Sequence, residues 1–290
     1  MKNILVFVNP KARQGNQLDT EIKNWLKDQG FNVLNSSFDP HKEKLIDVIA
    51  KFSGQKPVVL IGGGDGSVNE ALPALMKFEM PLLLIPLGTA NNLARSLEIP
   101  TDYKKALALL VEGQTKRIDV GVANDIPFVN VIGMGLSTQV NRVVRSDLKK
   151  LLGVFAFVLT AFKVGARMSP FKIRIDCEGE VHTAYSWQLS VCNGRNYGNG
   201  LVIHEDASLE DEELHALSTE VDNWWQGFAL IPSLLSGKFK KNHPVTILSG
   251  KKMSIRTKHT MSVDVDGDIK TKTPVELLVR PRALQVFVTG

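Results

Sequence analysis

The chain has 290 residues, of which 43% are hydrophobic and 22% are charged, and its formal net charge is +5. This composition is ordinary for a globular protein of one or two domains with a sizeable core, and it excludes disordered and fibrous classes. The apolar run Ile4–Val8 is too short for the core of a signal peptide, so we expect a buried strand there. Cys177 and Cys192 lack metal-binding spacing, and we expect inert thiols in a reducing cytoplasm.

Strand-like and helix-like segments alternate over the first 120 residues. The strand-like segments are 3–9, 31–38, 56–64 and 81–88, and the helix-like segments are 18–30, 42–54, 67–78 and 90–99. Continuous apolar strands separated by amphipathic helices predict a parallel sheet covered by helices on both faces. We therefore expect an α/β domain over residues 1–122.

The pattern changes after about residue 122. Runs rich in β-branched and aromatic residues follow at 171–179, 185–194, 253–258 and 261–268, each bounded by turn residues. They predict a second, mainly antiparallel domain over residues 123–282 with one inserted helical region, and the last strand, 283–290, is expected to return to the first domain. The most apolar segment, 151–168, is interrupted by Lys163 and is too short to span a membrane. We expect a core helix there, with a membrane-touching helix as the alternative.

Positive charge gathers in three short runs, which are Arg142/Arg145/Lys149/Lys150, Lys238/Lys240/Lys241 and Lys251/Lys252/Arg256/Lys258. Solvated faces explain most such runs, and the functional alternative is an anionic membrane surface that the protein binds reversibly. No nucleic-acid-binding motif accompanies them, so we expect no nucleic-acid partner. The pair Trp224–Trp225 is expected in the core, with a homodimer interface or a membrane anchor as alternatives.

A glycine-rich turn, "GGGDGS" at 62–67, follows the apolar strand "VVLI" and precedes a helix expected to begin near Val68. Glycines let the backbone close on a ligand, and the N-terminus of a helix presents N–H groups to an anion. Ligands also bind at the carboxyl ends of strands in α/β sheets. Phosphate is therefore the expected ligand, and a plain tight turn is the alternative. The P-loop, dinucleotide and protein-kinase signatures do not match this turn.

Two more loops at strand ends carry polar groups. In "IPLGTANNLA" Thr89, Asn91 and Asn92 offer hydroxyl and amide groups at the start of a helix, and in "NPKARQGN" Lys11 and Arg13 offer cations for phosphates. Because neighbouring parallel strands end at the same edge of a sheet, we expect the three loops to share one nucleotide.

Taken together, "GGGDGSVNEAL" and "PLGTANNLARSL" resemble the diacylglycerol kinase catalytic-domain family, in particular its bacterial lipid kinases. The match continues through "RIDVGVAN", "FVNVIGMG", "VCNGRNYGNG", "VDVDGD" and "PRALQVFV", and so covers nearly the whole chain. The resemblance implies an ATP- and magnesium-dependent enzyme with a Rossmann-like domain and a β-sandwich-like domain. It would transfer the γ-phosphate of ATP to the hydroxyl of a lipid such as diacylglycerol, in the cytoplasm and peripherally at the inner membrane surface.

The resemblance also assigns roles to residues. It places Asp65 and Asp119 in a magnesium network, Asp266 in an acidic cluster and Asp268 at the position of the general base. Phosphoryl transfer needs such groups, because magnesium bridges the phosphates and a carboxylate takes the hydroxyl proton. The implied ATP-binding residues are Asn9, Lys11, Arg13, Gly63, Gly64, Asp65, Gly66, Ser67, Val68, Asn69, Thr89, Asn91 and Asn92.

Several positions depart from the family's pattern. Asp268 is one methylene shorter than the family's glutamate, and Ser37 is the nearest substitute for a family threonine. A structural magnesium would use Ser208, Asp211 and Glu213, but Glu212 replaces the usual glycine there.

The segment "VDVDGD" has two interpretations. If it is strand-like, Asp266 and Asp268 point to the same side, whereas Asp-Gly is also a strong signal for a hairpin turn. Two other functions stay open at this point. One is a nucleotide- or lipid-binding regulator that has lost catalysis, and the other is an NAD kinase, which shares the fold and the glycine-rich turn.

Overall fold

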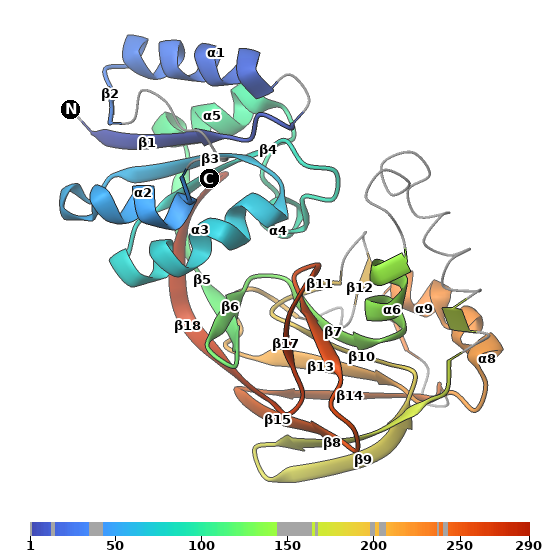
Figure 1. Ribbon diagram of the computed structural model, residues 1–290. Coiled ribbons are helices and arrows are strands. Elements are labelled where there is room, and N and C mark those ends of the chain that lie inside the picture. Colours follow the sequence, from blue (N-terminus) through green and yellow to red (C-terminus); the bar gives the residue numbers. More distant parts are fainter. Residues whose placement is uncertain are drawn as a thin grey trace. The chain divides into compact units, whose positions relative to one another are not determined.

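The computed structural model describes residues 2–12, 15–34, 43–143, 164–165, 168–197, 201–202, 207–236, 238–239 and 243–290. The chain divides into two compact units (Figure 1). Unit 1 comprises Met1–Val120 with Pro281–Gly290, and unit 2 comprises Gly121–Arg280. Two strands, β5 (Gln114–Ala123) and β18 (Val275–Val288), each contribute residues to both units.

Unit 1 is built on a parallel sheet. Its strands are β1 (Asn3–Val8), β2 (Asn32–Val33), β3 (Val58–Gly63) and β4 (Leu82–Pro86), in the order β2-β1-β3-β4. The last part of β18 joins the sheet parallel to β4, with Val286 opposite Leu82. The apolar side chains of β1, β3 and β4 are buried almost throughout, as expected for strands that are covered on both faces.

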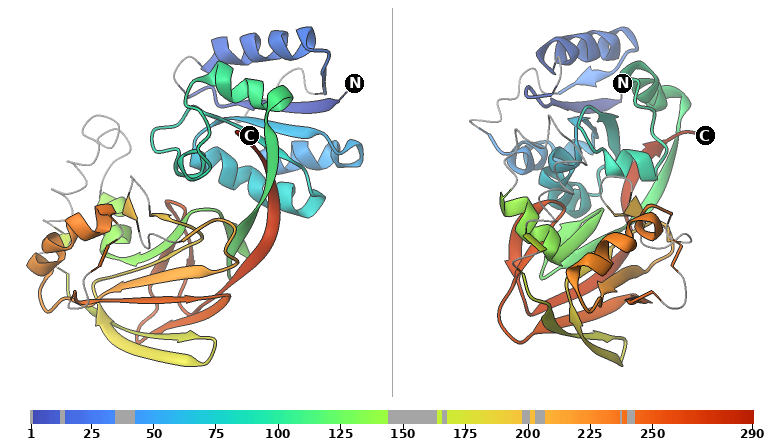
Figure 2. Two further views of the ribbon diagram at one scale, coloured as in Figure 1. Left: turned by 180° about the vertical axis from the view of Figure 1, so that it is seen from behind. Right: turned by 90° about the vertical axis from the view of Figure 1, so that its right-hand side faces the viewer.

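The helices of unit 1 lie on both sides of this sheet (Figure 2). They are α1 (Gly15–Asp28), α2 (Leu45–Lys51), η1 (Ser53–Gln55), α3 (Asp65–Phe78), α4 (Asn92–Ser96) and α5 (Tyr103–Glu112). Right-handed crossovers put α1 on one face and the packed pair α2 and α3 on the other. The predicted parallel sheet between helices is confirmed.

Three local features of unit 1 differ from the sequence predictions or go beyond them. Helix α3 begins at Asp65 and not near Val68, so three residues assigned to the turn form the first turn of the helix. Within the described part of the strand predicted over 31–38, the strand is Asn32–Val33, and residues 35–42 lie outside the described residues. Helix α5 was not predicted, although Asp102 caps it by accepting hydrogen bonds from Lys104 N and Lys105 N at 2.9 and 3.0 Å.

Unit 2 consists mainly of antiparallel strands. They are β6 (Ile126–Phe128), β7 (Val131–Gly135), β8 (Phe171–Cys177), β9 (Glu180–Ser186), β10 (Gln188–Cys192), β13 (Leu214–Thr219), β14 (Val245–Gly250), β15 (Lys252–Thr257), β16 (Ser262–Val265) and β17 (Asp268–Lys272). One sheet has the order β14-β13-β10-β7-β16-β17, and the other runs from β18 through β15 and β8 to β9. Alternate residues of the two sheets form one hydrophobic core, which includes Ile175, Leu189 and Ile255.

Shorter elements complete unit 2. They are α6 (Leu136–Val143), β11 (Asn196–Tyr197), β12 (Leu201–Val202), α8 (Trp224–Ala229) and α9 (Ile231–Ser236). The mixed α/β fold with a sandwich-like second part is the predicted fold class. Most of the apolar segment 151–168, including Lys163, lies outside the described residues, as do the side chains of Trp224 and Trp225. Within the described ranges, no helix is long and apolar enough to cross a membrane.

Both cysteines are buried, free thiols. Burial raises the pKa of the Cys177 thiol, and it raises that of Cys192 well above the ordinary value. Little thiolate therefore forms at neutral pH, which agrees with the expectation of unreactive cysteines.

Candidate functional site

Three loops leave the carboxyl ends of β1, β3 and β4, which are neighbours in the sheet of unit 1. Asn9 N, just after β1, donates a hydrogen bond to Gly62 O at 2.8 Å. Leu87 N, just after β4, donates to Gly63 O at 2.9 Å. The sheet therefore brings the three loops to one edge, where ligands of α/β proteins bind.

The loop after β1 is a compact turn organised by Asn9. Its side-chain Oδ1 accepts a hydrogen bond from Lys11 N at 2.9 Å, and its carbonyl accepts one from Ala12 N at 3.0 Å. A Cβ on Gly15 would lie 2.3 Å from Asn9 O, so the start of α1 packs closely against this turn. Lys11 is exposed at the tip, and Arg13 lies outside the described residues. One of the two predicted cations is thus available to a ligand at the loop.

The glycines after β3 serve different purposes. A Cβ on Gly88 would lie 2.5 Å from Gly64 Cα, so the loops after β3 and β4 pack backbone to backbone. A Cβ on Gly63 would lie 2.5 Å from Ser67 Oγ. At Gly66, in contrast, no atom other than those of its chain neighbours and the nearby backbone of α3 lies within 4 Å of an added Cβ. Gly66 is therefore the position of this turn where a ligand has room to approach the main chain.

The N-terminus of α3 presents donors at the same place. Ser67 N and Val68 N both donate to Gly64 O, at 3.0 and 3.3 Å. The N–H of Gly66 has no acceptor in the part of the chain that the structure describes. An N–H in the first turn of a 14-residue helix is a favourable partner for a phosphate oxygen.

Asp65 joins two of the loops. Its carboxylate accepts hydrogen bonds from Asn92 N at 3.0 Å and Leu93 N at 3.1 Å, which are the first N–H groups of α4. Asn91, at a φ of 50°, closes the same loop, because its Oδ1 accepts from Gly88 N at 3.0 Å and its Nδ2 donates to Gly88 O at 2.9 Å. Asp65 and Asn91 thus shape the loop that holds the exposed Thr89.

Two asparagine side chains near these loops have buried polar atoms without a hydrogen-bond partner among the described residues. Asn69 is 7% exposed and lies one helical turn after Asp65. Its side-chain oxygen and nitrogen, and Oδ1 of Asn92, have no hydrogen-bond partner among the described residues. Buried polar atoms of this kind are ordinarily satisfied by a water or a ligand. Together with the open space at Gly66, they fit a polar ligand bound at this edge of the sheet.

Asp119 is nearly inaccessible to solvent, with 1% of its surface exposed. Its Oδ1 accepts a hydrogen bond from Arg282 N at 2.8 Å, which links β5 to β18 within unit 1. Across the described ranges, no three His, Cys, Asp or Glu side chains gather in a way that could hold a metal. Magnesium bound to a nucleotide needs only one or two protein carboxylates in addition to phosphates and water. The assignment of Asp65 and Asp119 to this role stays a prediction.

The segment "VDVDGD" forms a hairpin in unit 2. Val265 pairs with Asp268, so Asp266 and Gly267 alone connect β16 to β17, at φ values of 51° and 97°. Two positive φ angles are typical of the tight turns that join twisted antiparallel strands. Asp266 and Asp268 are therefore not alternating residues of one strand, and the strand-like interpretation is wrong.

The two aspartates of this hairpin have different surroundings. The Asp266 carboxylate accepts hydrogen bonds from Val129 N, Asn130 N and Val131 N at 2.9, 3.0 and 2.7 Å, so it organises the loop before β7. Asp268 is exposed at the start of β17. The Asp268 carboxylate is therefore accessible to a substrate, whereas the nearby Asp266 carboxylate is hydrogen bonded to the backbone.

Among the residues predicted for a structural magnesium, Asp211 is already hydrogen bonded to protein groups. Asp211 accepts hydrogen bonds from Ser208 N at 2.8 Å and Glu213 N at 3.0 Å, and His215 Nε2 lies 2.9 Å from Asp211 Oδ2. Glu212 adopts a φ of 60°, the glycine-like conformation, and its carboxylate pairs with Lys251 Nζ at 2.9 Å. Protein groups therefore satisfy both oxygens of the Asp211 carboxylate, and a structural magnesium at Ser208, Asp211 and Glu213 stays a prediction.

Asp211 titrates below the ordinary range of a carboxyl group. Burial by itself would raise its pKa. The hydrogen bonds from His215, Ser208 N and Glu213 N together outweigh burial, so its pKa is lowered. Asp211 therefore stays ionised and keeps the loop closed at neutral pH.

Comparison with known proteins gives matches along the whole chain. Residues 3–123 match the diacylglycerol kinase catalytic domain, and residues 130–288 match the YegS C-terminal NAD kinase beta sandwich-like domain. A Staphylococcus saprophyticus protein named diacylglycerol kinase is 30% identical over 234 residues, which cover 79% of this chain and 76% of the relative. One of the same name from Staphylococcus aureus strain RF122 is 30% identical, with coverages of 79% and 74%. The crystal structure of a diacylglycerol kinase from Bacillus anthracis shares the fold, with a TM-score of 0.77 at 21% identity over 99% of this chain and 97% of that chain.

Proposed function

Because the chain belongs to the diacylglycerol kinase catalytic-domain family and is a lipid kinase, we propose that it transfers the γ-phosphate of ATP to a lipid hydroxyl, with magnesium as cofactor. The observation that carries this proposal is the opening at Gly66, where the first turn of α3 leaves room for a phosphate. Diacylglycerol is the acceptor favoured by the names of the relatives.

The loops of unit 1 supply complementary groups for the phosphates of ATP. The Gly66 N–H and the α3 N-terminus face the negative charge, the exposed Lys11 adds a cation, and the exposed Thr89 adds a hydroxyl. Asn69 and Asn92 have buried polar atoms that a bound ligand or its water shell would satisfy.

Asp65 and Asp119 are the residues that would hold magnesium, directly or through water. The ion would neutralise phosphate charge during transfer. Asp65 also fixes the start of α4 through Asn92 N and Leu93 N, so it holds two of the phosphate loops in one arrangement. Loss of Asp65 would therefore affect both the metal and the loop.

Asp268 is the proposed general base. It takes the proton of the lipid hydroxyl as the hydroxyl oxygen bonds to the γ-phosphorus, while the bond from that phosphorus to the oxygen it shares with the β-phosphate breaks and ADP leaves. Asp266 is a positioning residue, because its carboxylate is bonded to three backbone N–H groups. The hairpin turn at Asp266–Gly267 fixes where Asp268 begins β17.

Contact with the lipid substrate is proposed to take place at an anionic membrane surface to which the protein binds reversibly. The exposed cations Lys251, Lys252, Arg256 and Lys258 in unit 2 support this part of the proposal.

The test is ATP consumption by the purified protein with magnesium, against diacylglycerol and other lipid alcohols in mixed micelles and against NAD. Asp268→Asn removes the base at nearly constant volume. Asp125→Asn is a matched control, because Asp125 is an exposed aspartate in the turn between β5 and β6. We expect lipid-dependent turnover that Asp268→Asn abolishes and Asp125→Asn keeps. Turnover on NAD alone, or tight ATP binding without turnover on any acceptor, would contradict the proposal.

A further inference from the structure

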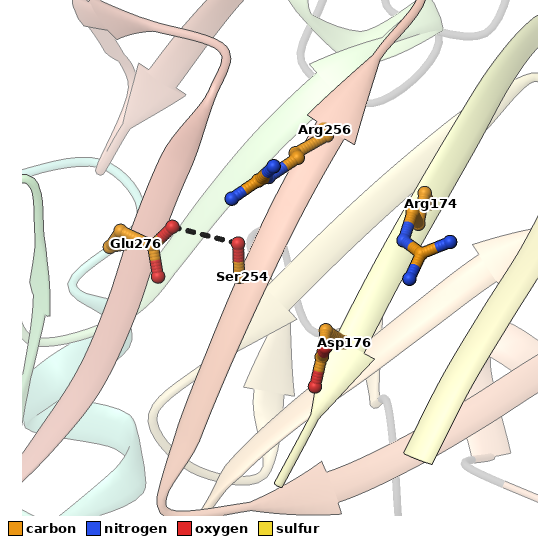
Figure 3. Close-up of a pocket in the computed structure, with 5 residues that line it drawn as sticks. All are labelled: Arg174, Asp176, Ser254, Arg256 and Glu276. Carbon is orange, nitrogen blue, oxygen red and sulfur yellow. Dashed lines mark hydrogen bonds between the residues drawn. The ribbon is translucent and has the colours of Figure 1, made fainter. Parts of the chain in front are cut away.

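The outer face of the sheet formed by β18, β15, β8 and β9 carries a polar pocket of about 340 Å³ (Figure 3). Alternate residues of these strands, such as Ile175 and Ile255, point into the core. The residues between them line the pocket, and they are Arg174, Asp176, Ser254, Arg256 and Glu276. None of these residues belongs to the proposed kinase site.

Two arginines occupy opposite positions on neighbouring strands of the pocket. Arg174 on β8 and Arg256 on β15 are direct cross-strand partners, so their Cβ atoms are about 4.5–5.5 Å apart. Like charges in such a pair destabilise a sheet unless an opposite charge lies between them. Neither guanidinium has a hydrogen bond or an ion pair with any residue in the described ranges. In Figure 3 the two arginines come from neighbouring strands; the Arg256 side chain extends towards Ser254 and Glu276, and the Arg174 side chain lies over β8.

The acidic residues of the pocket do not neutralise this pair. Asp176 and Glu276 lie in the next row, opposite Ser254, which is about 6.7 Å further along the strands. Asp176 Oδ1 accepts a hydrogen bond from Gly179 N at 3.0 Å, and Glu276 Oε1 accepts one from Ser254 Oγ at 2.7 Å. The pocket thus has a cationic row and a separate anionic row. The exposed Lys172, two residues before Arg174 on β8, adds positive charge on the side of the arginines away from the anionic row.

We propose that Arg174 and Arg256 bind a phosphate group between them. Each guanidinium group presents several N–H donors in one plane. One carboxylate has only two oxygens and cannot accept from both groups at once, whereas a phosphate has enough oxygens to accept hydrogen bonds from both. The carboxylates of the next row repel a long polyanion, so the site takes a single phosphate. Such a group occurs in a phospholipid head group and in free phosphate or a soluble phosphate ester.

The direct test observes the two arginines themselves. In the isotope-labelled full chain, inorganic phosphate is titrated at constant ionic strength while the Nε–Hε signals of Arg174 and Arg256 are followed by NMR. We expect both signals to shift with one saturation curve. Because these signals report only on the pocket, phosphate bound at the nucleotide loops does not affect the reading. If neither signal moves, the proposal is overturned, whether or not the protein is a lipid kinase.

A pair of double variants tests the charges and identifies the source of the phosphate. Arg174→Gln/Arg256→Gln is expected to keep or slightly raise the wild-type Tm, because it removes the repulsion between the two arginines, and to weaken binding of phosphate at the pocket by about tenfold or more. Lys272→Gln/Arg280→Gln removes two exposed cations outside the pocket from β17 and β18, and it should bind phosphate as the wild type does. Unchanged phosphate affinity in the arginine variant would overturn the proposal.

Sedimentation with phosphatidylglycerol vesicles distinguishes the two sources. If only the arginine variant loses vesicle binding, the phosphate is that of a lipid head group. If vesicle binding is equal in all three proteins while the NMR signals respond to phosphate, the ligand is a soluble phosphate.

Discussion

Gly66 and Gly88 give a matched test of the loop geometry. In Gly88→Ala the new Cβ would lie 2.5 Å from Gly64 Cα and 2.7 Å from Asn91 Oδ1. Because the nearest atom is backbone, the loops after β3 and β4 must move apart, and overpacking of this kind costs about 1–3 kcal/mol. In Gly66→Ala no atom other than those of its chain neighbours and the nearby backbone of α3 lies within 4 Å of the new Cβ, and alanine is a better helix former than glycine by up to about 1 kcal/mol.

Thermal unfolding and ATP binding separate the two effects. In a domain of 150–250 residues each kcal/mol changes Tm by about 2–4 °C, so Gly88→Ala should unfold several degrees below the wild type. Gly66→Ala should keep or slightly raise Tm, yet bind ATP at least about tenfold more weakly, because its methyl group fills the space that the phosphate needs. Wild-type ATP affinity in Gly66→Ala would refute the phosphate site at this turn, and an unchanged Tm in Gly88→Ala would refute the packing argument.

Three further predictions concern unit 2. EDTA should leave the Tm of the nucleotide-free protein unchanged, because Asp211 is already held by protein groups; a fall of several degrees would show a structural metal. The pKa of Asp211 is lowered from 3.8, so its ionised form stabilises the folded protein above that pH, and this stabilisation is lost as the pH falls towards the folded-state pKa. The wild type should therefore have a higher Tm than Asp211→Asn at neutral pH, and the difference in Tm should shrink below about pH 4. A difference in Tm that does not change with pH would contradict this. Asp266→Ala leaves three backbone N–H groups without their acceptor, so its free energy of unfolding should fall by about 1.5–3 kcal/mol, measured by urea unfolding against the Asp125→Ala control. An equal fall in both variants would contradict the positioning role of Asp266.

Much of the architecture follows from the sequence pattern. The buried strands β1, β3 and β4 are continuous apolar runs separated by amphipathic helices, and this pattern has few solutions other than a covered parallel sheet. The adjacency of the three strand-end loops follows from the same sheet. The family membership indicated by the motifs is confirmed by the matches over 3–123 and 130–288.

Contacts between distant residues were not predictable in this way. The sequence indicated glycines for a ligand, but Gly64 and Gly88 are required by the packing of two loops that lie 24 residues apart in the chain numbering. Likewise, Asp65 reaches the backbone of α4, and no local pattern announces that contact. Glu212 keeps a glycine-like φ because the surrounding loop and Lys251 hold it, a result of tertiary structure overriding local preference.

The most direct measurement is the transfer of label from γ-labelled ATP to diacylglycerol in mixed micelles, with magnesium, by the wild type, Asp268→Asn and Asp125→Asn. We expect labelled phosphatidic acid from the wild type and Asp125→Asn and none above background from Asp268→Asn. Equal labelling by Asp268→Asn would contradict the role of Asp268. No labelled lipid from the wild type, with any lipid alcohol, would contradict the account of this chain as an ATP-dependent lipid kinase.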